Sequence, residues 1–345
     1  MRLCVIAHSA VHLRQQAYYR ELARQGADVR VVCPAAWGEH RAAPIKEPGY
    51  EVVPLNPVEA EGGMATFRLP ARKVVTDFKP HWVYVQNEPF HAVAHDAMRW
   101  AREAGANFAV YTWENNDWIV TEKAREVLGA TDLVVCGNTE AKMLCYPFAT
   151  MDFLTDLQVG VEPDLFPFWP QWQRRHDLLF VSRLDDPMKG AGIVGALMKW
   201  YPEWTVLIPH ERGRLPYEQM SLRYRMAKIL LTPSIELPGQ PREQGPAYTN
   251  LEAMFCGTPV VTTDTASIDE WLHDAPVERV CIEEVQNPER PEEVSQGPFE
   301  EPITRLLAGE RVPAERAVAA RFWAETRFSN AAVAKRLLDA LEAAT

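Results

Sequence analysis

Several features are missing from this sequence of 345 residues, and each absence excludes a class of protein. It has no run of about 18 consecutive apolar residues, so no segment is predicted to cross a membrane. The apolar start of the chain, residues 1–7, is short and is followed at once by His8 and a polar segment, which predicts a first strand rather than a signal peptide. Low-complexity tracts are absent too. Hydrophobic residues make up 47% and charged residues 24%, as in ordinary packed proteins, so a disordered chain is excluded.

Cysteine patterns that bind metals are also missing. The six cysteines form neither a C-x-x-C pair nor a cluster with histidine at the spacing of zinc ligands. Four of them lie in or beside apolar runs, where a reduced cysteine acts as a small core side chain. A D-x-D metal motif does not occur either. We therefore expect a cytoplasmic protein that uses no metal and no cofactor.

Positive charge is in the minority. The sequence has 36 Lys and Arg against 47 Asp and Glu, a formal net charge of -11 at pH 7. Such a balance keeps a protein soluble and disfavours nonspecific attraction to nucleic acid or to anionic lipid. Nucleic acid is therefore the least favoured of the partners considered below.

The first half of the chain alternates short apolar runs with amphipathic segments. The spacing predicts helices at 15–25, 92–104 and 122–128, and strands at 3–7, 29–33, 51–55, 83–86, 108–112 and 133–136. Strands that alternate with helices favour a parallel sheet covered on both faces.

After a linker rich in proline and tryptophan at 160–175, the alternation restarts, with strands expected at 178–182, 204–208, 229–231, 259–263 and 280–282. Two such sets predict an α/β protein of two doubly wound, Rossmann-like domains facing across a cleft, with ligands beyond the carboxyl ends of the strands. We place the N-terminal domain at 1–165 and the C-terminal domain at 166–324, and expect the last helix, about 325–345, to pack back on the first domain. The acidic, proline-rich stretch 283–300 is predicted to be a surface loop.

The most informative segment is 242–263, REQGPAYTNLEAMFCGTPVVTT. It predicts a turn at Gly245, a short helix that contains Glu252, a stop at Gly257 and then a buried strand. A glycine turn that opens onto a helix directs unpaired backbone N–H groups at whatever lies in front of it, which makes an anion site.

A second segment, 180–190, has the sequence FVSRLDDPMKG. A predicted strand ends at Ser182, and the loop after it presents Arg183 and Lys189 before a helix at 191–200. Two cations in a loop at the carboxyl end of a parallel strand can neutralise a diphosphate.

Together the two segments resemble the C-terminal domain of the family 4 glycosyltransferases, also called glycosyl transferases group 1, which are retaining enzymes of the GT-B fold. That family has a G/S-R-L…K-G loop and an E-G-F-G-x-x-x-x-E-A-M-x-x-G-x-P-V-V segment. The matching residues are Arg183 and Lys189 in the loop, and Glu252, Ala253, Met254, Gly257, Pro259, Val260 and Val261 in the segment. Further landmarks are similar in the same order: Gly160, Val161, Phe166, Pro233, Ser234 and Glu270.

The resemblance implies the roles of these residues. Arg183 and Lys189 would stabilise the charge that develops on the leaving diphosphate, without a metal, and Glu252 would accept hydrogen bonds from ribose hydroxyls. The other residues expected to bind the donor, a UDP- or GDP-sugar, are Glu243, Gln244, Gly245, Pro246, Tyr248 and Thr249. In the family pattern an acid stands eight residues before Glu252, and here that position is Gln244, which can still hydrogen-bond a sugar hydroxyl.

The N-terminal half would bind the acceptor, which is a glycan, a lipid or a small molecule. Polar residues follow predicted strands there, and these are His8, His12, Arg14, Asn87, Glu88 and Asn115. The family's histidine in a T-V-H-G-like turn is replaced by YTWENND, in which Glu114 stands at about that position, as a candidate base or orienting group.

Structural interpretations remain open for several of these residues. Glu114 can simply accept a hydrogen bond at a strand end, and His8 and His12 can cap or pack beside the first helix. A lone loop cation is usually only solvated, and the linker tryptophans Trp169 and Trp172 suit packing between domains.

Three other functions compete with sugar transfer. A Rossmann dehydrogenase needs G-x-G-x-x-G after the first strand, and the sequence there, AHSAVHLRQQ, contains no glycine. A nucleotide-sugar-binding relative without turnover and a same-fold nucleotide-sugar epimerase both stay open.

Overall fold

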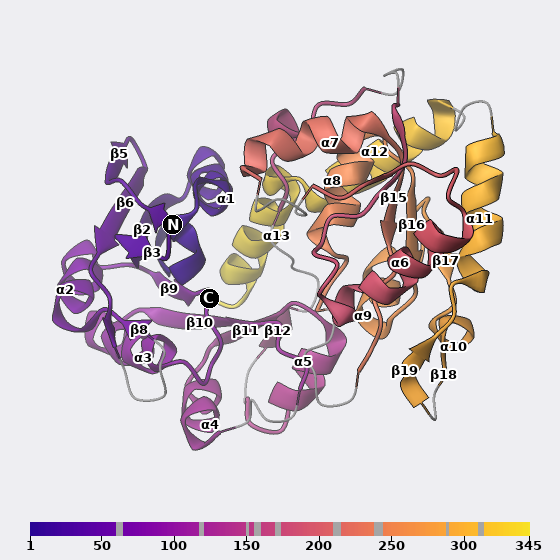
Figure 1. The fold of residues 1–345 in the computed structure, drawn as a ribbon. Helices are drawn as coiled ribbons and strands as arrows, with labels where there is room; N and C mark the ends of the chain where they lie inside the picture. The colour runs from indigo at the N-terminus through magenta and orange to yellow at the C-terminus, as the bar shows by residue number, and fades with distance from the viewer. Residues whose placement is uncertain are drawn as a thin grey trace. The chain divides into compact units, whose positions relative to one another are not determined.

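The computed structural model describes the chain except for residues 60–64, 117–120, 150–151, 155–159, 170–173, 210–214, 238–243, 288–289 and 310–313. It describes the backbone alone of residues 59, 65, 68, 69, 152, 291, 292 and 314. Contacts divide the chain into two compact units, which we call unit 1 (Met1–Glu162 with Asn330–Thr345) and unit 2 (Pro163–Ser329) (Figure 1). The boundaries expected from the sequence, 165/166 and about 324/325, lie a few residues from these.

Unit 1 is built on one sheet with the strand order β12-β11-β10-β9-β1-β2-β6-β5. Every neighbouring pair is parallel except β5 and β6. The strands are β1 Arg2–Ile6, β2 Asp28–Pro34, β5 Ile45–Glu47, β6 Tyr50–Leu55, β9 Trp82–Val85, β10 Asn107–Thr112, β11 Leu133–Cys136 and β12 Asp152–Leu154. Two small antiparallel pairs join β3 Ala36–Trp37 to β4 His40–Arg41, and β7 Val58–Glu59 to β8 Ala65–Thr66.

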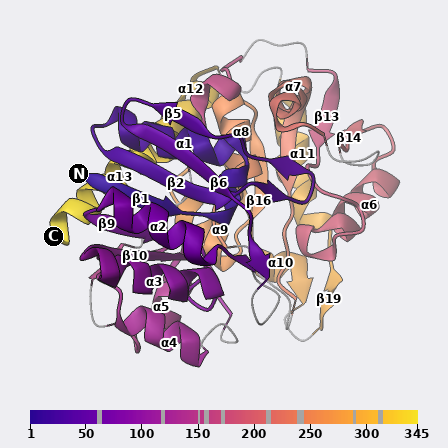
Figure 2. The same cartoon turned by 90° about the vertical axis from the view of Figure 1, so that its left-hand side faces the viewer.

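Side chains of the central strand β1 alternate between two cores, as the period of a strand requires. Leu3 and Val5 belong to the core on one face of the sheet, and Cys4 and Ile6 to the core on the other. The first core includes buried residues of α1 (Leu13–Arg24) and α13 (Asn330–Ala343). The second includes residues of α2 (Arg68–Phe78), α3 (Ala92–Ala104), α4 (Glu122–Gly129) and α5 (Thr139–Cys145). Helices therefore cover both faces, with α2 and α3 side by side on the second face (Figure 2).

The last helix, α13, belongs to unit 1 although it follows the whole of unit 2 in the sequence. It packs against α1, and its apolar stripe of Val333, Leu337 and Leu341 is fully buried in the first core. This contact lies wholly within unit 1.

Unit 2 has a parallel sheet with the strand order β14-β13-β15-β16-β17. Its strands are β13 His176–Leu179, β14 Val206–Leu207, β15 Ala227–Thr232, β16 Val260–Thr263 and β17 Glu278–Val280. Its α-helices are α6 Ala191–Trp200, α7 Met220–Met226, α8 Tyr248–Cys256, α9 Ala266–Leu272, α10 Ile282–Val285, α11 Gly297–Ala308 and α12 Ala314–Phe328. Short 3-10 turns occur at η1 His8–Val11 in unit 1, and at η3 Pro163–Leu165, η4 Pro187–Lys189 and η5 Tyr217–Gln219 in unit 2.

The core of unit 2 joins strand residues such as Leu178 and Ile229 to α6 and α11. Helix α8 is buried from Asn250 to Cys256 and contacts β15, β16, α7 and α12. Because α8 is enclosed in this way, the residues at its first turn are held in a fixed position.

The predicted α/β fold is confirmed in each unit, but two local expectations were wrong. The strand expected at 178–182 ends at Leu179, so the loop that carries Arg183 starts earlier. The stretch 283–300 is not a plain surface loop. It contains most of α10, the hairpin of β18 Gln286–Asn287 and β19 Arg290–Val294, and the start of α11. The structure forms these elements because Val285 and Phe299 are buried in the unit 2 core, a tertiary contact that composition does not show.

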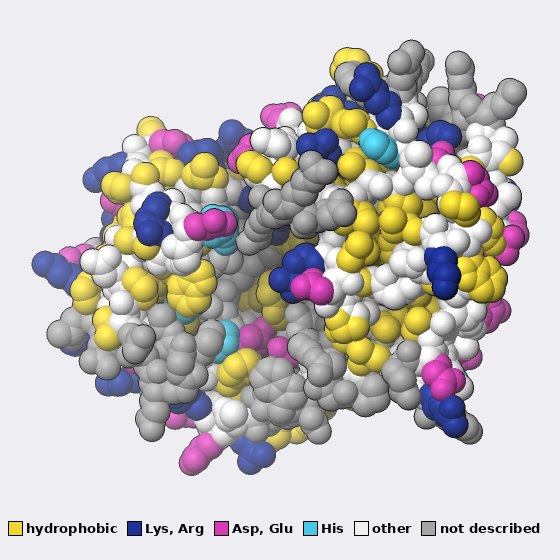
Figure 3. All heavy atoms as spheres, viewed as in Figure 1, with side chains coloured by type: hydrophobic (Ala, Val, Ile, Leu, Met, Phe, Trp, Pro, Cys, Tyr) yellow, Lys and Arg dark blue, Asp and Glu magenta, His cyan; other side chains and the backbone are white. Residues whose placement is uncertain are grey.

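Three further features concern the surface and the cysteines. In the described parts of the chain, no helix is both long and apolar enough to cross a membrane. None of the six cysteines forms a disulfide, and five of them are buried. Acidic and basic side chains are interspersed on the face shown in Figure 3.

Candidate functional site

The sheet of unit 2 has a topological switch point between β13 and β15. The chain leaves β13 through α6 to β14 on one side, and β15 lies on the other side of β13. In open parallel sheets, the loops after two such strands diverge and leave a crevice in which ligands bind. The loop after β13 is the one that carries Arg183 and Lys189.

The loop after β13 contacts the residues that follow β15, and the contact is next to Lys189, the second cation of the loop. Lys189 is half-buried and is followed by Gly190, whose φ is +70°. A Cβ atom on Gly190 would lie 2.7 Å from the carbonyl carbon of Pro233, so only glycine permits this approach. The Ile235 N–H donates a hydrogen bond of 3.0 Å to the Met188 carbonyl. The backbone on both sides of Lys189 is therefore held at the switch point.

Arg183 is more weakly constrained. Its side chain is exposed and pairs with Asp185 at 3.1 Å, with both partners more than two-thirds exposed. An ion pair in water contributes between zero and about 1 kcal/mol. An incoming anion can therefore replace Asp185 at small cost.

The start of α8 is tied to the same edge of the sheet. The Thr232 hydroxyl, at the end of β15, donates to Asn250 Oδ1 at 2.7 Å, and Asn250 Nδ2 donates to the Pro246 carbonyl at 3.0 Å. Asn250 is fully buried. The cation loop, the end of β15 and the first turn of α8 therefore lie together. Sequence analysis missed Thr232 and Asn250, because their pairing spans two elements.

The turn before α8 has an unusual backbone. Ala247, the N-cap, has φ +54° and ψ 120° and supplies no side-chain hydrogen bond to the helix. It occupies the position of the second glycine of the E-G-F-G pattern, which explains why the chain needs a positive φ there. Ala247 therefore supplies no side-chain cap to the first N–H groups of α8, at the position where helices bind anions.

The other expected donor residues surround this turn. Gly245 and Pro246 are buried, and Gln244, Tyr248 and Thr249 are half-buried. Glu243 lies outside the described residues, as does Trp172.

Glu252 is only 3% exposed, and both of its oxygens already accept hydrogen bonds. Tyr217 donates to Oε1 at 2.8 Å and Tyr224 to Oε2 at 2.6 Å. Burial first, and then the nearby Glu252, raise the pKa of Tyr224 well above its usual value, so it keeps its proton and remains a donor. Each carboxylate oxygen has a second lone pair that can accept from a ligand. No spacing or motif pointed to these tyrosines, which lie 35 and 28 residues away in the chain.

Unit 1 has its own switch point, between β1 and β9. His8 follows β1, and Asn87 follows β9. The two residues are joined by two hydrogen bonds, from the His8 backbone N–H to Asn87 Oδ1 at 3.2 Å and between Asn87 Nδ2 and His8 Nδ1 at 3.1 Å. The Trp37 ring stacks on the His8 ring at 5.2 Å, and Phe67 contacts it edge-on at 5.4 Å. Burial first, and then His91, lower the pKa of His8 to about 4.

Two acids lie at the same edge of unit 1. Glu88 is buried and accepts from the Thr112 hydroxyl at 2.5 Å and from the Trp113 N–H at 3.1 Å, so it links the end of β9 to the end of β10. Burial is the main cause that raises the pKa of Glu88 to about 7. Glu114 is buried as well, and its Oε1 accepts from Asn116 at 2.9 Å.

The remaining residues expected on the acceptor side follow strands β1 and β10. Asn115 is buried beside Glu114. The His12 ring lies 4.0 Å from the His40 ring. Arg14 is half-buried in the first turn of α1. The structure thus brings His8 and Asn87 together, and separately places Glu88 beside β10.

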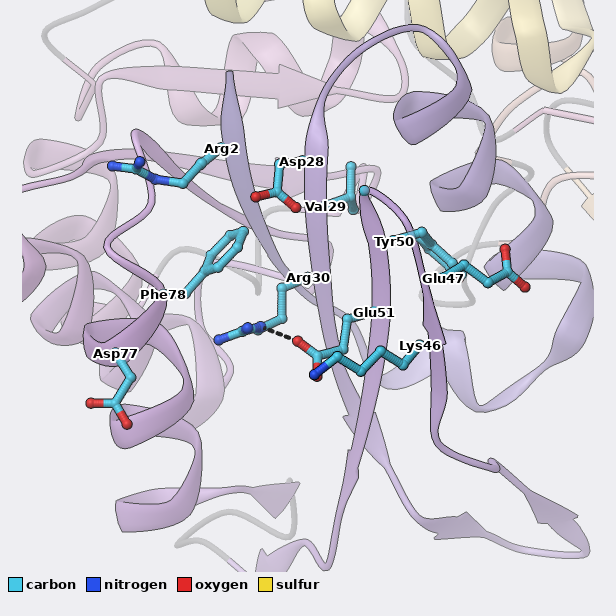
Figure 4. A pocket seen from close by; sticks show the side chains of 11 residues that line it. Arg2, Asp28, Val29, Arg30, Lys46, Glu47, Tyr50, Glu51, Asp77 and Phe78 are labelled. Carbon is cyan, nitrogen blue, oxygen red and sulfur yellow. Dashed lines mark ion pairs between the residues drawn. The ribbon is translucent and has the colours of Figure 1, made fainter.

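A pocket of about 300 Å³ lies at the opposite edge of the unit 1 sheet, where strands begin (Figure 4). Its lining includes Arg2, Asp28 and Tyr50, the first residues of β1, β2 and β6. Arg30 there pairs with Glu51 at 2.6 Å and packs on Phe78 at 4.4 Å, so its charge is already compensated. The pocket lies at the opposite end of the strands from the unit 1 switch point, and we assign it no role.

Residues 212–294 match the family model of the glycosyl transferases group 1. This range includes α7, β15, α8 and β16 and therefore the segment around Glu252, while Arg183 and Lys189 precede it. No curated protein sequence matches the chain at a significant level.

Solved structures match nearly the whole chain. The structure of HepE from Anabaena, in complex with UDP, has a TM-score of 0.66 and 13% identity, and the match covers 99% of this chain and 100% of that one. Sucrose-phosphate synthase from Thermosynechococcus elongatus has a TM-score of 0.60 and 14% identity, with 100% of both chains covered. UDP-GlcNAc 2-epimerase from Methanocaldococcus jannaschii has a TM-score of 0.56 and 11% identity, with 99% and 100% covered. At such identities the likeness shows the fold, which is the GT-B fold of two Rossmann-like domains.

Proposed function

We propose that this protein is a glycosyltransferase that moves a sugar from a nucleoside diphosphate sugar to an acceptor hydroxyl, with retention of configuration and without a metal. The observation that carries the proposal is the arrangement at the unit 2 switch point. There a loop with two cations is tied through β15 to the uncapped start of α8, in the region where the family model matches. The UDP complex of HepE supports a uridine donor, and a GDP-sugar is the second choice.

The arrangement suits a diphosphate for electrostatic reasons. Lys189 is preplaced, Arg183 is released from Asp185 at small cost, and the α8 N–H groups carry the positive end of the helix dipole. Fixed donors aimed at developing charge lower the barrier most when they need no reorganisation. In this proposal the cations stabilise the leaving diphosphate, which replaces the charge of a metal ion.

The other donor residues would bind the sugar and the nucleoside. Gly245, Pro246, Tyr248 and Thr249 would surround the phosphates, and Glu243 and Gln244 would hold hydroxyls of the transferred sugar. Glu252, oriented by its two tyrosines, would accept a hydrogen bond from a ribose hydroxyl. Its buried position keeps that acceptor at one place.

The unit 1 switch point would bind the acceptor, a glycan, a lipid or a small molecule. His8 and Asn87 stand there, with His12, Glu88 and Asn115 on the flanking loops and Arg14 in the first turn of α1. Glu114 would orient the acceptor hydroxyl or accept its proton. The Glu88 carboxyl already accepts hydrogen bonds from Thr112 and Trp113, so its role would be to keep the ends of β9 and β10 in place.

The first experiment is a thermal-shift panel with UDP, GDP, ADP and dTDP and their sugars. A ligand that binds only the folded state must raise the melting temperature. We then expect slow hydrolysis of the stabilising sugar nucleotide, and transfer of its sugar to surrogate acceptors with the anomeric configuration kept. Chelator should leave the rate unchanged. Strict dependence on a divalent ion would contradict the fixed-cation mechanism.

Substitution of the two cations tests the donor site. We expect Arg183→Ala and Lys189→Ala each to lower turnover on the order of a hundredfold, the usual cost of losing one charge-stabilising contact. Lys199→Ala is the matched control, because Lys199 is exposed in the last turn of α6 in the same unit. The assignment fails if both site variants keep most of their activity.

Two other functions have specific support. The epimerase among the similar structures favours isomerisation of a nucleotide sugar, which product analysis would reveal as an epimer. Glutamine at position 244, where the pattern has an acid, favours a binding protein without turnover. Such a protein would show a thermal shift but neither hydrolysis nor transfer.

A further inference from the structure

The switch point of unit 1 contains a hydrogen-bond donor that no described group uses. His8 and Asn87 stand on its two sides, one after β1 and one after β9. Both come from strand ends that diverge to opposite faces, which is where a doubly wound sheet binds its ligand. His8 is 7% exposed.

The hydrogen bonds at Asn87 fix where its amide points. The His8 backbone N–H can only donate, so the atom facing it must be the amide oxygen, Oδ1, at 3.2 Å. The amide nitrogen therefore faces the His8 ring, 3.1 Å from Nδ1. A reversed amide would set N–H against N–H at the first contact.

The same contact fixes the proton of the His8 ring. Because Asn87 Nδ2 donates, Nδ1 must accept and carries no proton. In a neutral ring the proton then resides on Nε2. A doubly protonated ring would turn an N–H toward the Asn87 N–H, so this contact opposes a charged His8, in agreement with the lowered pKa.

The Nε2–H group is buried and has no hydrogen-bond partner among the described residues. A buried donor left without an acceptor destabilises the folded state. A ligand that supplies the acceptor to this donor, held in one tautomer at the switch point, would remove that penalty. The ring is also fixed in place, since Trp37 stacks on it and Phe67 contacts its edge.

The surroundings select an uncharged ligand group. The ring itself is neutral, burial lowers the pKa of His91 in the loop after β9 to about 4, and the carboxyls of Glu88 and Glu114 stand on the neighbouring strand ends. An anionic group would be repelled by a carboxylate in such a partly buried place. The Trp37 ring, 40% exposed, adds an apolar surface next to the donor.

We propose that His8 binds the acceptor substrate by donating a hydrogen bond from Nε2–H to one of its uncharged oxygens, and that Asn87 holds His8 in the tautomer that permits this. The inference rests on the proposed function, because it takes the ligand of unit 1 to be the acceptor of sugar transfer. It adds the chemical class of the bound group, a hydroxyl or ether oxygen rather than a phosphate or carboxylate.

The tautomer is tested first, by ¹⁵N NMR of the full chain labelled at its nine histidines. Comparison with His8→Gln assigns the His8 signals. We expect an unprotonated Nδ1 and a protonated Nε2 from pH 5.5 to pH 8. A protonated Nδ1, or titration of the ring within this range, would overturn the proposal.

Binding is tested on the same sample by adding methyl glycosides of glucose, galactose and mannose, with inorganic phosphate as the anionic arm. We expect the His8 Nε2–H signal to move with at least one glycoside and to stay in place with phosphate. A shift with phosphate alone, or with none of the probes, would overturn the proposal and leave His8 a packing residue.

A matched pair of variants separates the donor from the packing of the ring. The amide nitrogen of glutamine reaches about as far as Nε2, and that of asparagine only as far as Nδ1. His8→Gln should keep glycoside affinity within about threefold, and His8→Asn should lower it at least tenfold. Equal losses in both variants would contradict the assignment. UDP affinity, measured in parallel, should not change in either variant, and loss of UDP binding by the unmodified protein would instead refute the proposed function.

Discussion

Replacing Gly190 by alanine probes the contact that fixes Lys189. The added Cβ would lie 2.7 Å from the Pro233 carbonyl carbon, and the obstacle is backbone, which cannot rotate away. Alanine also disfavours the φ of +70° found at this position, at a cost of about 1–2 kcal/mol. Overpacking of a well-packed site adds about 1–3 kcal/mol. The sum is roughly 2–5 kcal/mol against folding of unit 2.

Calorimetry is the suitable assay, because it can resolve the transitions of the two units. For a domain of this size, 1 kcal/mol corresponds to about 2–4 °C, so the unit 2 transition should fall by roughly 4–20 °C. The affinity for UDP should fall as well, because the loop must move away from Pro233 and takes Lys189 with it.

Gly192→Ala is the control for this substitution. Gly192 lies in α6 two residues later, and an added Cβ would meet nothing within 4 Å. Alanine is the better helix former there, so we expect stabilisation by about 0.5–1 kcal/mol. The reasoning about Gly190 is refuted if both variants melt alike and bind UDP with the affinity of the unmodified protein.

Three further predictions concern single side chains. Ala247→Gly should leave the melting temperature unchanged or raise it, because glycine adopts the positive φ at that N-cap without strain, whereas Ala196→Gly inside α6 should cost about 1 kcal/mol. Folding raises the pKa of the Glu88 carboxyl, so the folded state binds more protons than the unfolded state and loses stability as the pH rises. The melting temperature of the unmodified protein, relative to that of Glu88→Gln, should therefore fall between pH 5 and pH 8. Equal pH profiles of melting temperature would contradict the buried position of this acid. Tyr224→Phe should lower unfolding stability by about 1.5–3 kcal/mol in urea titrations, because the buried Glu252 carboxylate loses a donor; an unchanged midpoint would mean that this hydrogen bond contributes nothing.

The sequence by itself determined the elements and much of the fold class. Residues Leu3 to Ile6 form a continuous apolar run, which is typical of a parallel strand buried on both faces, and such a run can be seen in the sequence. A last helix was likewise expected at about 325–345, and the structure has α13 there, with Val333, Leu337 and Leu341 on its buried side. These are local patterns, so they can be recognised without knowing what lies next to them in space.

Only the tertiary structure decided which side chains meet. His8 and Asn87 are 79 residues apart in the sequence, and their mutual hydrogen bonds fix an imidazole tautomer that no spacing indicates. Glu252 was expected from its motif, but its two tyrosine partners come from elsewhere in unit 2. The burial of Phe299 likewise made a helix start where composition suggested a loop. Contacts between distant segments form only when the chain folds. Sequence periodicity predicts the helices and strands, but it does not show which of their side chains will meet.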